Sequence, residues 1–203
     1  MLPLAGLKAK TLNRKGRKDP AKDAKKQRNV DTIILRMSHN RARIAHFLFA
    51  LIVVLVDRWT KHLAATRIRL YAHIQIIPGF FRLTHTENTG AAFSLFADSH
   101  GHWKTDLLIA FSVVAMVIVC VLLWKQTRAL TMTGIALSLI LGGAAGNLWD
   151  RLVSGRVVDF LLFYVKRYEW PVFNLADSSI VIGASLLVIE VLFRRSPDEM
   201  GKT

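Results

Sequence analysis

The feature that most limits how this chain can fold is a run of 18 consecutive uncharged residues, 107–124 (LLIAFSVVAMVIVCVLLW). A helix of this length matches the roughly 20 residues that cross a hydrocarbon layer about 30 Å thick. With 203 residues in all, the chain has too little protein to surround several such helices in a water-soluble core. The run therefore predicts a transmembrane helix and an integral membrane protein.

Three more apolar runs predict further helices, at residues 44–65, 129–149 and 175–193. The purely apolar parts of the first and the last are too short to cross a membrane. Extending each to about 20 residues brings Asp57 into the first helix and Asp177 into the last. Because an aspartate at mid-bilayer costs about 2.5–3.5 kcal/mol on insertion scales, these residues indicate a polar network or a functional site.

Charge divides the chain into three regions. Residues 1–43 contain thirteen Lys or Arg against three Asp and account for most of the net charge of +14. We expect a disordered basic tail over residues 1–43, a membrane domain over residues 44–195 and a second tail over residues 196–203. Four spans with both termini in the cytoplasm fit the basic residues that flank the predicted helices. These are Arg41, Arg43, Lys125, Arg128, Arg194 and Arg195.

The basic tail has more than one interpretation. A basic block just before an apolar helix holds that end of the helix on the cytoplasmic side, and it can also bind anionic lipid or nucleic acid. The tail contains no aromatic residue that could stack on bases, so we expect no nucleic-acid partner. Met37, shortly before the first apolar run, is an alternative translation start.

Two segments are predicted to lie outside the membrane. Residues 67–83 alternate with period two and turn at Pro78 and Gly79, which predicts a short sheet on the membrane surface. Residues 160–171 (FLLFYVKRYEWP) are typical of an interfacial helix or loop. The predicted fold class is an all-α integral membrane protein with four transmembrane helices, a small extracytoplasmic β-sheet and an interfacial helix or loop.

Polar residues gather at the predicted outer ends of the helices and in the outer connections. They are Asp57, Lys61, Asn88, Asn147, Asp150, Arg151, Asp159, Asn174 and Asp177. Four separate segments thus deliver amides and charges to one face of the bilayer, which indicates a mutual network or a functional site.

Some of these residues have a simple structural interpretation. Asp57 and Lys61 are spaced i, i+4 and either pair along their helix or belong to a site. Asp150 with Arg151 is favoured as a helix-end charge pair, while Arg151 alone is a candidate to steady a carboxylate or bind a substrate carbonyl. Asn174 is a candidate N-cap of the last helix.

Asp159 and Asp177 are the strongest candidates for catalysis. Two carboxylates close together in a low-dielectric site cannot both ionise cheaply, so one keeps a proton near neutral pH. Such a pair supplies a base that activates water and an acid that protonates the leaving amine. This is the chemistry of an aspartic protease.

No metal or cofactor is expected. The histidines show no metal-ligand spacing such as HExxH. The single cysteine, Cys120, lies inside the longest apolar run and cannot form an internal disulfide. We interpret it as a small hydrophobic residue.

Four blocks of the sequence resemble the lipoprotein signal peptidase (signal peptidase II) family. They are DRWTK at 57–61, ENTGAAFSL at 87–95, GGAAGNLWDRLVSGRVVDF at 142–160 and FNLADSSIVIG at 173–183. Their order and spacing match over residues 44–195, and the last two blocks together are highly specific. Arg58 stands where the family more often has glutamine, and the basic tail is not part of the family pattern.

The resemblance implies a four-helix aspartic endopeptidase of the bacterial inner (cytoplasmic) membrane, with its active site near the outer face. It assigns Asp159 and Asp177 as the catalytic pair. Family members cut the signal peptide from prolipoproteins just before a cysteine that carries diacylglycerol. The implied partners are lipid-modified prolipoproteins and membrane lipid, and we expect a monomer. The implied substrate-binding or supporting residues are Asp57, Lys61, Asn88, Gly90, Asn147, Arg151, Asn174 and Ala176.

Two other classes of protein are alternatives. A transporter or proton relay also uses intramembrane carboxylates, but its polar groups should run through the depth of the membrane. Here only Glu190 lies toward the inner end, where we expect it to reach the interface or Arg194. A scaffold without catalysis, with a tail that binds lipid, is the other alternative. The two aspartates in their motifs favour the peptidase.

Overall fold

The computed structural model describes residues 20–90, 103–126 and 131–193. The chain divides into two units, Met1–Met37 and Ser38–Thr203. The residues that form the candidate site belong to the second unit. Part of the block at 87–95 lies outside the described residues, as do three residues named above, Arg128, Arg194 and Arg195.

Four helices follow one another along the chain: α1 (Pro20–Arg67), α2 (Trp103–Trp124), α3 (Met132–Ser154) and α4 (Leu175–Phe193). Each overlaps one of the four predicted helices. The third extends beyond the predicted end at residue 149, because Asp150 and Arg151 form a last charged turn. Thr131 caps its start, and Gly155, with φ of 71°, ends it in the left-handed conformation that glycine adopts easily.

The predicted disorder of residues 1–43 does not hold for residues 20–43, which are helical. Proline suits the first position of a helix, where Pro20 stands, and the Lys, Arg, Gln and Ala that follow have high helix propensity. Two hydrogen bonds between residues four apart, Gln27 to Asp31 and Thr32 to the Arg28 carbonyl, lie on the helix surface.

Three helices are long and apolar enough to cross a membrane among the described residues: Thr105–Trp124, Met132–Ser154 and Leu175–Phe193. In α1 the uncharged stretch, residues 44–56, is only 13 residues long before Asp57 and Arg58. The fourth span therefore stays a prediction. Apolar side chains on α2 are widely exposed, as in Phe111 (73%) and Val114 (59%), which suits contact with lipid.

Small residues allow the helices to approach closely. Gly142 of α3 lies against Ala50 and Val53 of α1, and Gly143 lies against Ala176 of α4. Such contacts replace the hydrophobic effect as the main attraction between helices in lipid. Larger apolar side chains complete a buried cluster next to them, with half-buried Cys120 packed against it. The core of that cluster is Ala50, Leu123, Leu137 and Leu141.

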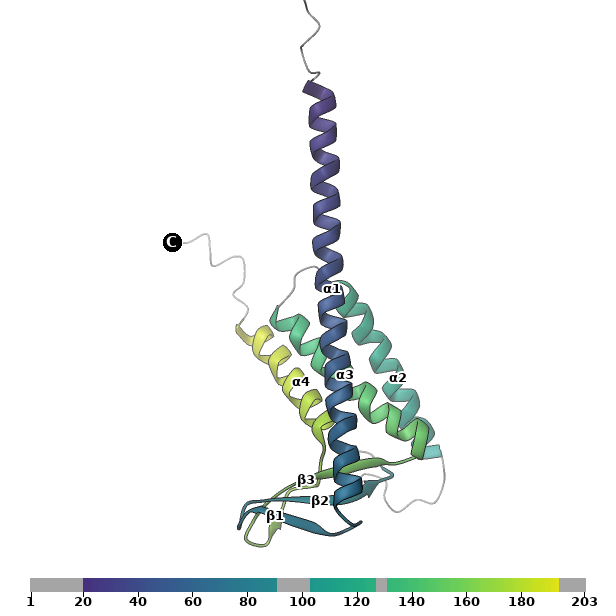
Figure 1. The fold of residues 1–203 in the computed structure, drawn as a ribbon, viewed down its shortest axis with the longest axis vertical. Coiled ribbons are helices and arrows are strands. Elements are labelled where there is room, and N and C mark those ends of the chain that lie inside the picture. Colours follow the sequence, from purple (N-terminus) through teal and green to yellow (C-terminus); the bar gives the residue numbers. More distant parts are fainter. Residues whose placement is uncertain (1–19, 91–102, 127–130, 194–203) are drawn as a thin grey trace, which may run out of the picture. The chain divides into compact units, whose positions relative to one another are not determined.

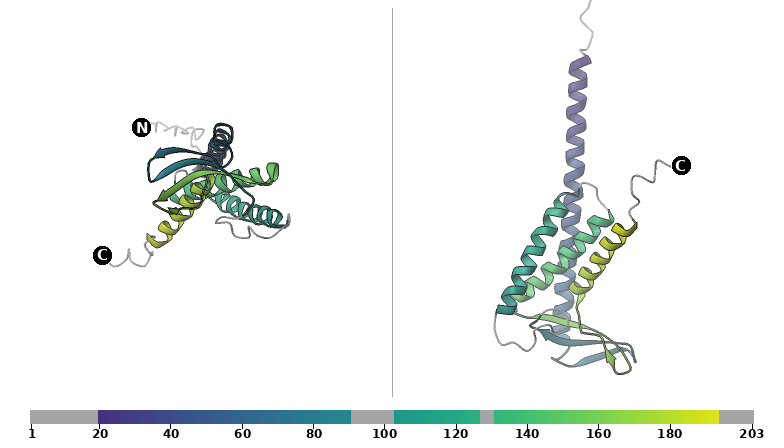
Figure 2. Two further views of the ribbon diagram at one scale, coloured as in Figure 1. Left: turned by 90° about the horizontal axis from the view of Figure 1, so that it is seen from below. Right: turned by 180° about the vertical axis from the view of Figure 1, so that it is seen from behind.

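An antiparallel sheet of four strands joins the helices, in the order β1-β2-β3-β4. The strands are β1 (His73–Ile77), β2 (Phe81–Asn88), β3 (Val157–Val165) and β4 (Tyr168–Glu169). Figure 1 and Figure 2 show β1, β2 and β3 together at the end of the helices where α1 and α3 finish and α4 starts. The sheet predicted within residues 67–83 is confirmed and is larger than expected.

The interfacial helix or loop predicted for residues 160–171 is wrong, because most of this segment forms β3 and β4. Residues 157–165 (VVDFLLFYV) favour a strand once a partner strand is available, and β2 supplies it. Phe163 also stacks on Phe81, with ring centroids 4.8 Å apart, and on Phe173 at 5.9 Å. The pairing of β3 with β2, which lies about 80 residues earlier in the chain, therefore outweighs the local sequence pattern that predicted an interfacial helix or loop.

A methyl group added at Gly142 should separate α1 from α3. A Cβ atom there would lie 2.6 Å from Cβ of Val53 and 2.7 Å from the carbonyl oxygen of Ala50. Overpacking of this kind costs about 1–3 kcal/mol. We expect Gly142→Ala to lower the thermal unfolding temperature in detergent. Val153→Ile, which adds a methyl group at a 68% exposed position of α3, is the control and should leave it unchanged.

Candidate active site

The first turn of α4 holds one of the two aspartates in place. The Asn174 side-chain oxygen accepts a hydrogen bond from the Asp177 N–H at 2.9 Å, and the Asp177 carboxylate accepts one from the Asn174 N–H at 3.2 Å. This reciprocal pair is a capping box, so Asn174 is the N-cap of α4, as predicted. The same bonds fix the Asp177 carboxylate at the positive end of the helix.

Strand β3 brings the second aspartate to the same place. The backbone of Leu161 pairs with that of Phe173, through hydrogen bonds of 2.8 and 3.1 Å, and so anchors the start of α4 to β3. Asp159, two residues before Leu161, is 3% exposed. Its Oδ1 accepts a hydrogen bond of 2.7 Å from the side-chain NH2 of Asn174. Asn174 therefore contacts both aspartates.

Strand β2 and helix α3 each supply an amide to the site. Asn88, in β2, donates to Oδ2 of Asp159 at 3.0 Å, and its own oxygen accepts the N–H of Gly90 at 2.9 Å. Asn147, in α3, donates to Oδ1 of Asp177 at 2.8 Å. Each aspartate thus accepts hydrogen bonds on both of its oxygens.

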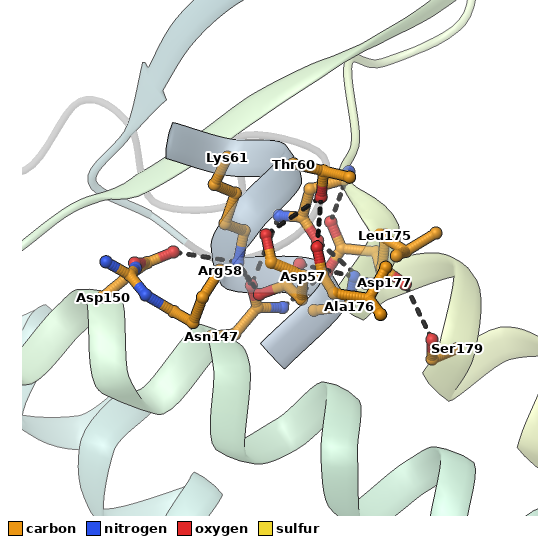
Figure 3. Close-up of polar contacts among 12 residues, drawn as sticks. Asp57, Arg58, Thr60, Lys61, Asn147, Asp150, Leu175, Ala176, Asp177 and Ser179 are labelled. Carbon is orange, nitrogen blue, oxygen red and sulfur yellow. Dashed lines mark hydrogen bonds and ion pairs between the residues drawn. The ribbon is translucent and has the colours of Figure 1, made fainter. Parts of the chain in front are cut away.

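Helix α1 contributes Asp57 and Lys61, which join α1 to α3 and α4 (Figure 3). They form the i, i+4 ion pair that the sequence suggested, at 2.8 Å, and both side chains are almost fully buried. Asp57 also accepts the N–H of Ala176 at 2.9 Å, and Lys61 donates to Oδ1 of Asn147 at 2.8 Å. The predicted pairing along the helix is therefore confirmed, and the role of this pair in a site stays a prediction.

The predicted charge pair between Asp150 and Arg151 is wrong. Asp150 pairs instead with Arg58 and with Lys61, the latter at 2.8 Å, because α1 places both cations beside it. Arg151 donates to the carbonyl oxygen of Asn147 at 3.2 Å. Arg58, the departure from the usual family residue, therefore has a structural partner.

Asp159 and Asp177 line one pocket of about 400 Å³. Asn88, Asn147, Arg151 and Ser178 line it as well, so six polar side chains line the same space. Its apolar wall comes from Val157, residues 170–173, Ile180 and Val181. The sequence analysis did not predict this apolar wall. One of its residues, the apolar Val181, is 64% exposed. A pocket with a polar floor and an apolar wall can hold a peptide bond next to an acyl chain.

Glu190 is the polar residue that we placed toward the inner end of the last helix. We expected Glu190 of α4 to reach the interface or Arg194, which lies outside the described residues; it accepts a hydrogen bond of 2.6 Å from Thr133 of α3. Groups of three or more His, Cys, Asp or Glu that could hold a metal ion are absent from the described residues.

Burial raises the pKa of Asp159 to about 6, from an ordinary value of 3.8. The hydrogen bonds from Asn88 and Asn174 oppose this increase in the pKa, and the nearby Asp177 adds to it. The loss of water around the carboxylate outweighs the hydrogen bonds that it gains. At neutral pH this carboxyl takes up a proton far more easily than an ordinary aspartate.

Comparison with known proteins identifies the family. The family model described as Signal peptidase (SPase) II matches residues 49–193, which include both aspartates and every residue of the network above. The chain belongs to the signal peptidase II family. It is therefore a membrane protease of the type that acts in lipoprotein maturation.

Relatives of known name agree with this assignment. The chain is 42% identical over 143 residues to the lipoprotein signal peptidase of Solibacter usitatus, an alignment covering 70% of this chain and 87% of the relative. It is 40% identical over 163 residues to the lipoprotein signal peptidase of Desulforapulum autotrophicum, covering 79% and 99%. A solved structure of a bacterial membrane enzyme at 2.3 Å resolution matches with a TM-score of 0.65 and 30% identity, covering 78% of this chain and 91% of that one.

The raised pKa of Asp159 should make this signal peptidase II less stable as the pH rises. Between pH 3.8 and about 6 the folded protein binds more protons than the unfolded chain, so the free energy of unfolding falls over this range. We expect Asp159→Asn to lack this contribution. As the pH rises through this range, the thermal unfolding temperature of the variant in detergent should increase relative to that of the wild type. Above about pH 7 the difference between the two unfolding temperatures should be constant. If the unfolding temperature of the wild type instead increased relative to that of the variant over this range, the raised pKa of Asp159 would be contradicted.

Proposed function

We propose that this protein is an aspartic endopeptidase that removes signal peptides from diacylglyceryl-modified prolipoproteins. The observation that carries the proposal is that Asn174 hydrogen bonds to both aspartates, at 2.7 Å to Asp159 and 3.2 Å to Asp177. Two carboxylates joined through one residue and lining one pocket can act on a single water molecule. The named relatives are lipoprotein signal peptidases, which supports the choice of substrate.

The chemistry divides between the two carboxylates. One of them, ionised, removes a proton from water, and the resulting hydroxide attacks the peptide carbonyl carbon before the lipidated cysteine. The other, protonated, donates its proton to the amine that leaves as the C–N bond breaks. Its raised pKa suits Asp159 to the acid role, and its position at the N-terminus of α4 suits Asp177 to the base role.

The surroundings of the pocket suit a lipidated substrate. The diacylglyceryl chains would stay in the bilayer against the exposed apolar face of α4, while the scissile bond reaches the polar floor. Arg151, on that floor, is placed to polarise the carbonyl group as negative charge develops on its oxygen. The substrate would reach the pocket by lateral diffusion, without leaving the membrane.

The proposed topology follows from the charges and the helices. Four spans place both termini in the cytoplasm and the sheet, with the pocket, near the outer face of the bacterial inner membrane. We propose that the protein acts as a monomer, since every residue of the proposed site comes from one chain.

Neither aspartate should be replaceable by its amide. We expect Asp159→Asn and Asp177→Asn each to lower the cleavage rate at least about 1,000-fold, because each removes a proton-transfer group from the dyad. The measurement is mass spectrometry of a diacylated prolipoprotein incubated with the purified protein. Asp106→Asn, which changes a carboxylate of the first turn of α2, is the matched control and should cut at the wild-type rate. Substantial cleavage by either dyad variant would overturn the proposal.

The cleavage rate should decline at high pH. The active dyad carries one proton, so the rate falls once that proton is lost. Burial already raises the pKa of Asp159 to about 6, and a bound lipidated substrate excludes still more water. We therefore expect a decline of kcat with an apparent pKa at or above 6. A rate that stays constant to about pH 10, where an exposed aspartate has long been ionised, would contradict a shared proton.

A further inference from the structure

We propose that Lys61 is a positioning residue that fixes the side-chain amide of Asn147 so that its NH2 group faces Asp177. The inference rests on the proposed function and deepens it, because it concerns how one carboxylate of the dyad is held for catalysis. Lys61 does not line the pocket. Its charge lowers the pKa of Asp159, and its hydrogen bond to Asn147 links it to the residue that donates to Asp177.

The ammonium group of Lys61 makes a hydrogen bond to Asn147 and ion-pair contacts with Asp57 and Asp150. Its ammonium group has three N–H bonds and no acceptor. Three oxygens lie 2.8 Å from its Nζ: Oδ2 of Asp57, Oδ2 of Asp150 and Oδ1 of Asn147. The residue is 1% exposed, so no water competes for these bonds. The ammonium group is therefore held in one position and presents a donor to Asn147.

This donor decides which way the Asn147 amide points. An asparagine side chain offers one oxygen and one NH2 group, and only the oxygen can accept from Lys61. The NH2 group of Asn174 donates to the same oxygen, at 3.3 Å. The NH2 group of Asn147 is thereby left to face Oδ1 of Asp177, at 2.8 Å. A rotated amide would place its NH2 against the ammonium group and its oxygen against a carboxylate, and would lose these bonds in a buried site.

The other two amides of the site are fixed by main-chain groups. The oxygen of Asn174 accepts the N–H of Asp177, and the oxygen of Asn88 accepts the N–H of Gly90. Their NH2 groups therefore face Asp159. Asn147 differs from them because a side chain from another helix holds its oxygen. A substitution can remove that side chain, which makes the role of Lys61 testable.

The charge of Lys61 is balanced without the dyad. Lys61 and Arg58 pair with Asp57 and Asp150, so two cations face two carboxylates. In this balanced group, Arg58 contacts Asp150 but not Asn147. Replacing either cation changes the charge of the group equally, but only the loss of Lys61 removes the shorter of the two hydrogen bonds that hold the Asn147 oxygen.

The test compares Lys61→Met with Arg58→Met in the purified full chain, using a diacylated prolipoprotein over a range of pH. We expect Lys61→Met to lower kcat at least about tenfold, to change KM less than about twofold, and to shift the pH–rate profile to higher pH. The shift has this sign because the variant lacks the positive charge of Lys61, which lowers the pKa of Asp159. Arg58→Met should keep kcat and the profile close to those of the wild type. Equal profiles for the two variants would overturn the proposal.

A second variant covers the case in which Lys61→Met does not fold. Asn147→Asp keeps an oxygen for Lys61 and for Asn174 but has no NH2 group to offer Asp177. It should fold, cut at least about tenfold more slowly and show the same shift to higher pH. A wild-type rate and profile for this variant would overturn the proposal. Asp159→Asn and Asp177→Asn, measured in parallel, separate the two questions. Cleavage by these two variants would contradict the proposed function. If they are inactive while Asn147→Asp cuts at the wild-type rate, only the role of Lys61 is contradicted.

Discussion

The candidate site depends on how the first turn of α4 is satisfied. The N–H groups at the start of a helix have no partner within the helix, and leaving them bare near a membrane is costly. Here the Asp57 carboxylate takes the N–H of Ala176, and the side chains of Asn174 and Asp177 satisfy each other's main-chain N–H groups. The bonds that cap the helix are therefore also the bonds that position Asp177, so stability and the proposed catalysis share one set of contacts.

Burial of charge is the second constraint, and the fold meets it by grouping opposite charges. Lys61 is almost fully buried yet has a carboxylate on each of two sides, Asp57 and Asp150. This arrangement requires α1 and α3 to lie very close, and Gly146 allows it, since a Cβ atom there would lie 2.5 Å from the Asp57 carboxylate. A buried ion pair stabilises a fold weakly, but losing one partner is expensive, which makes such a group intolerant of single changes.

Local sequence patterns predicted the helices well and the sheet only in part. The run at 107–124 and the run at 175–193 have enough apolar residues to define helices by length alone, and the structure places helices there. Residues 160–171 gave the wrong element because their strand partner, β2, lies about 80 residues earlier in the chain. The predicted partner of Asp150, Arg151, was also wrong because the actual partners are distant along the chain: Arg58 and Lys61 come from a different helix.

By itself, the sequence determined that the chain belongs in a membrane, which polar residues stand out against the apolar helices, and which family its motifs resemble. Those properties follow from composition and spacing, which are local. Only the tertiary structure decided which oxygen faces which donor. Asn174 could be named from its position before α4, but its bond to Asp159 needs the backbone pairing of Leu161 with Phe173. The physical reason is that hydrogen bonds and ion pairs have a short range, so they depend on packing between segments that are distant along the chain.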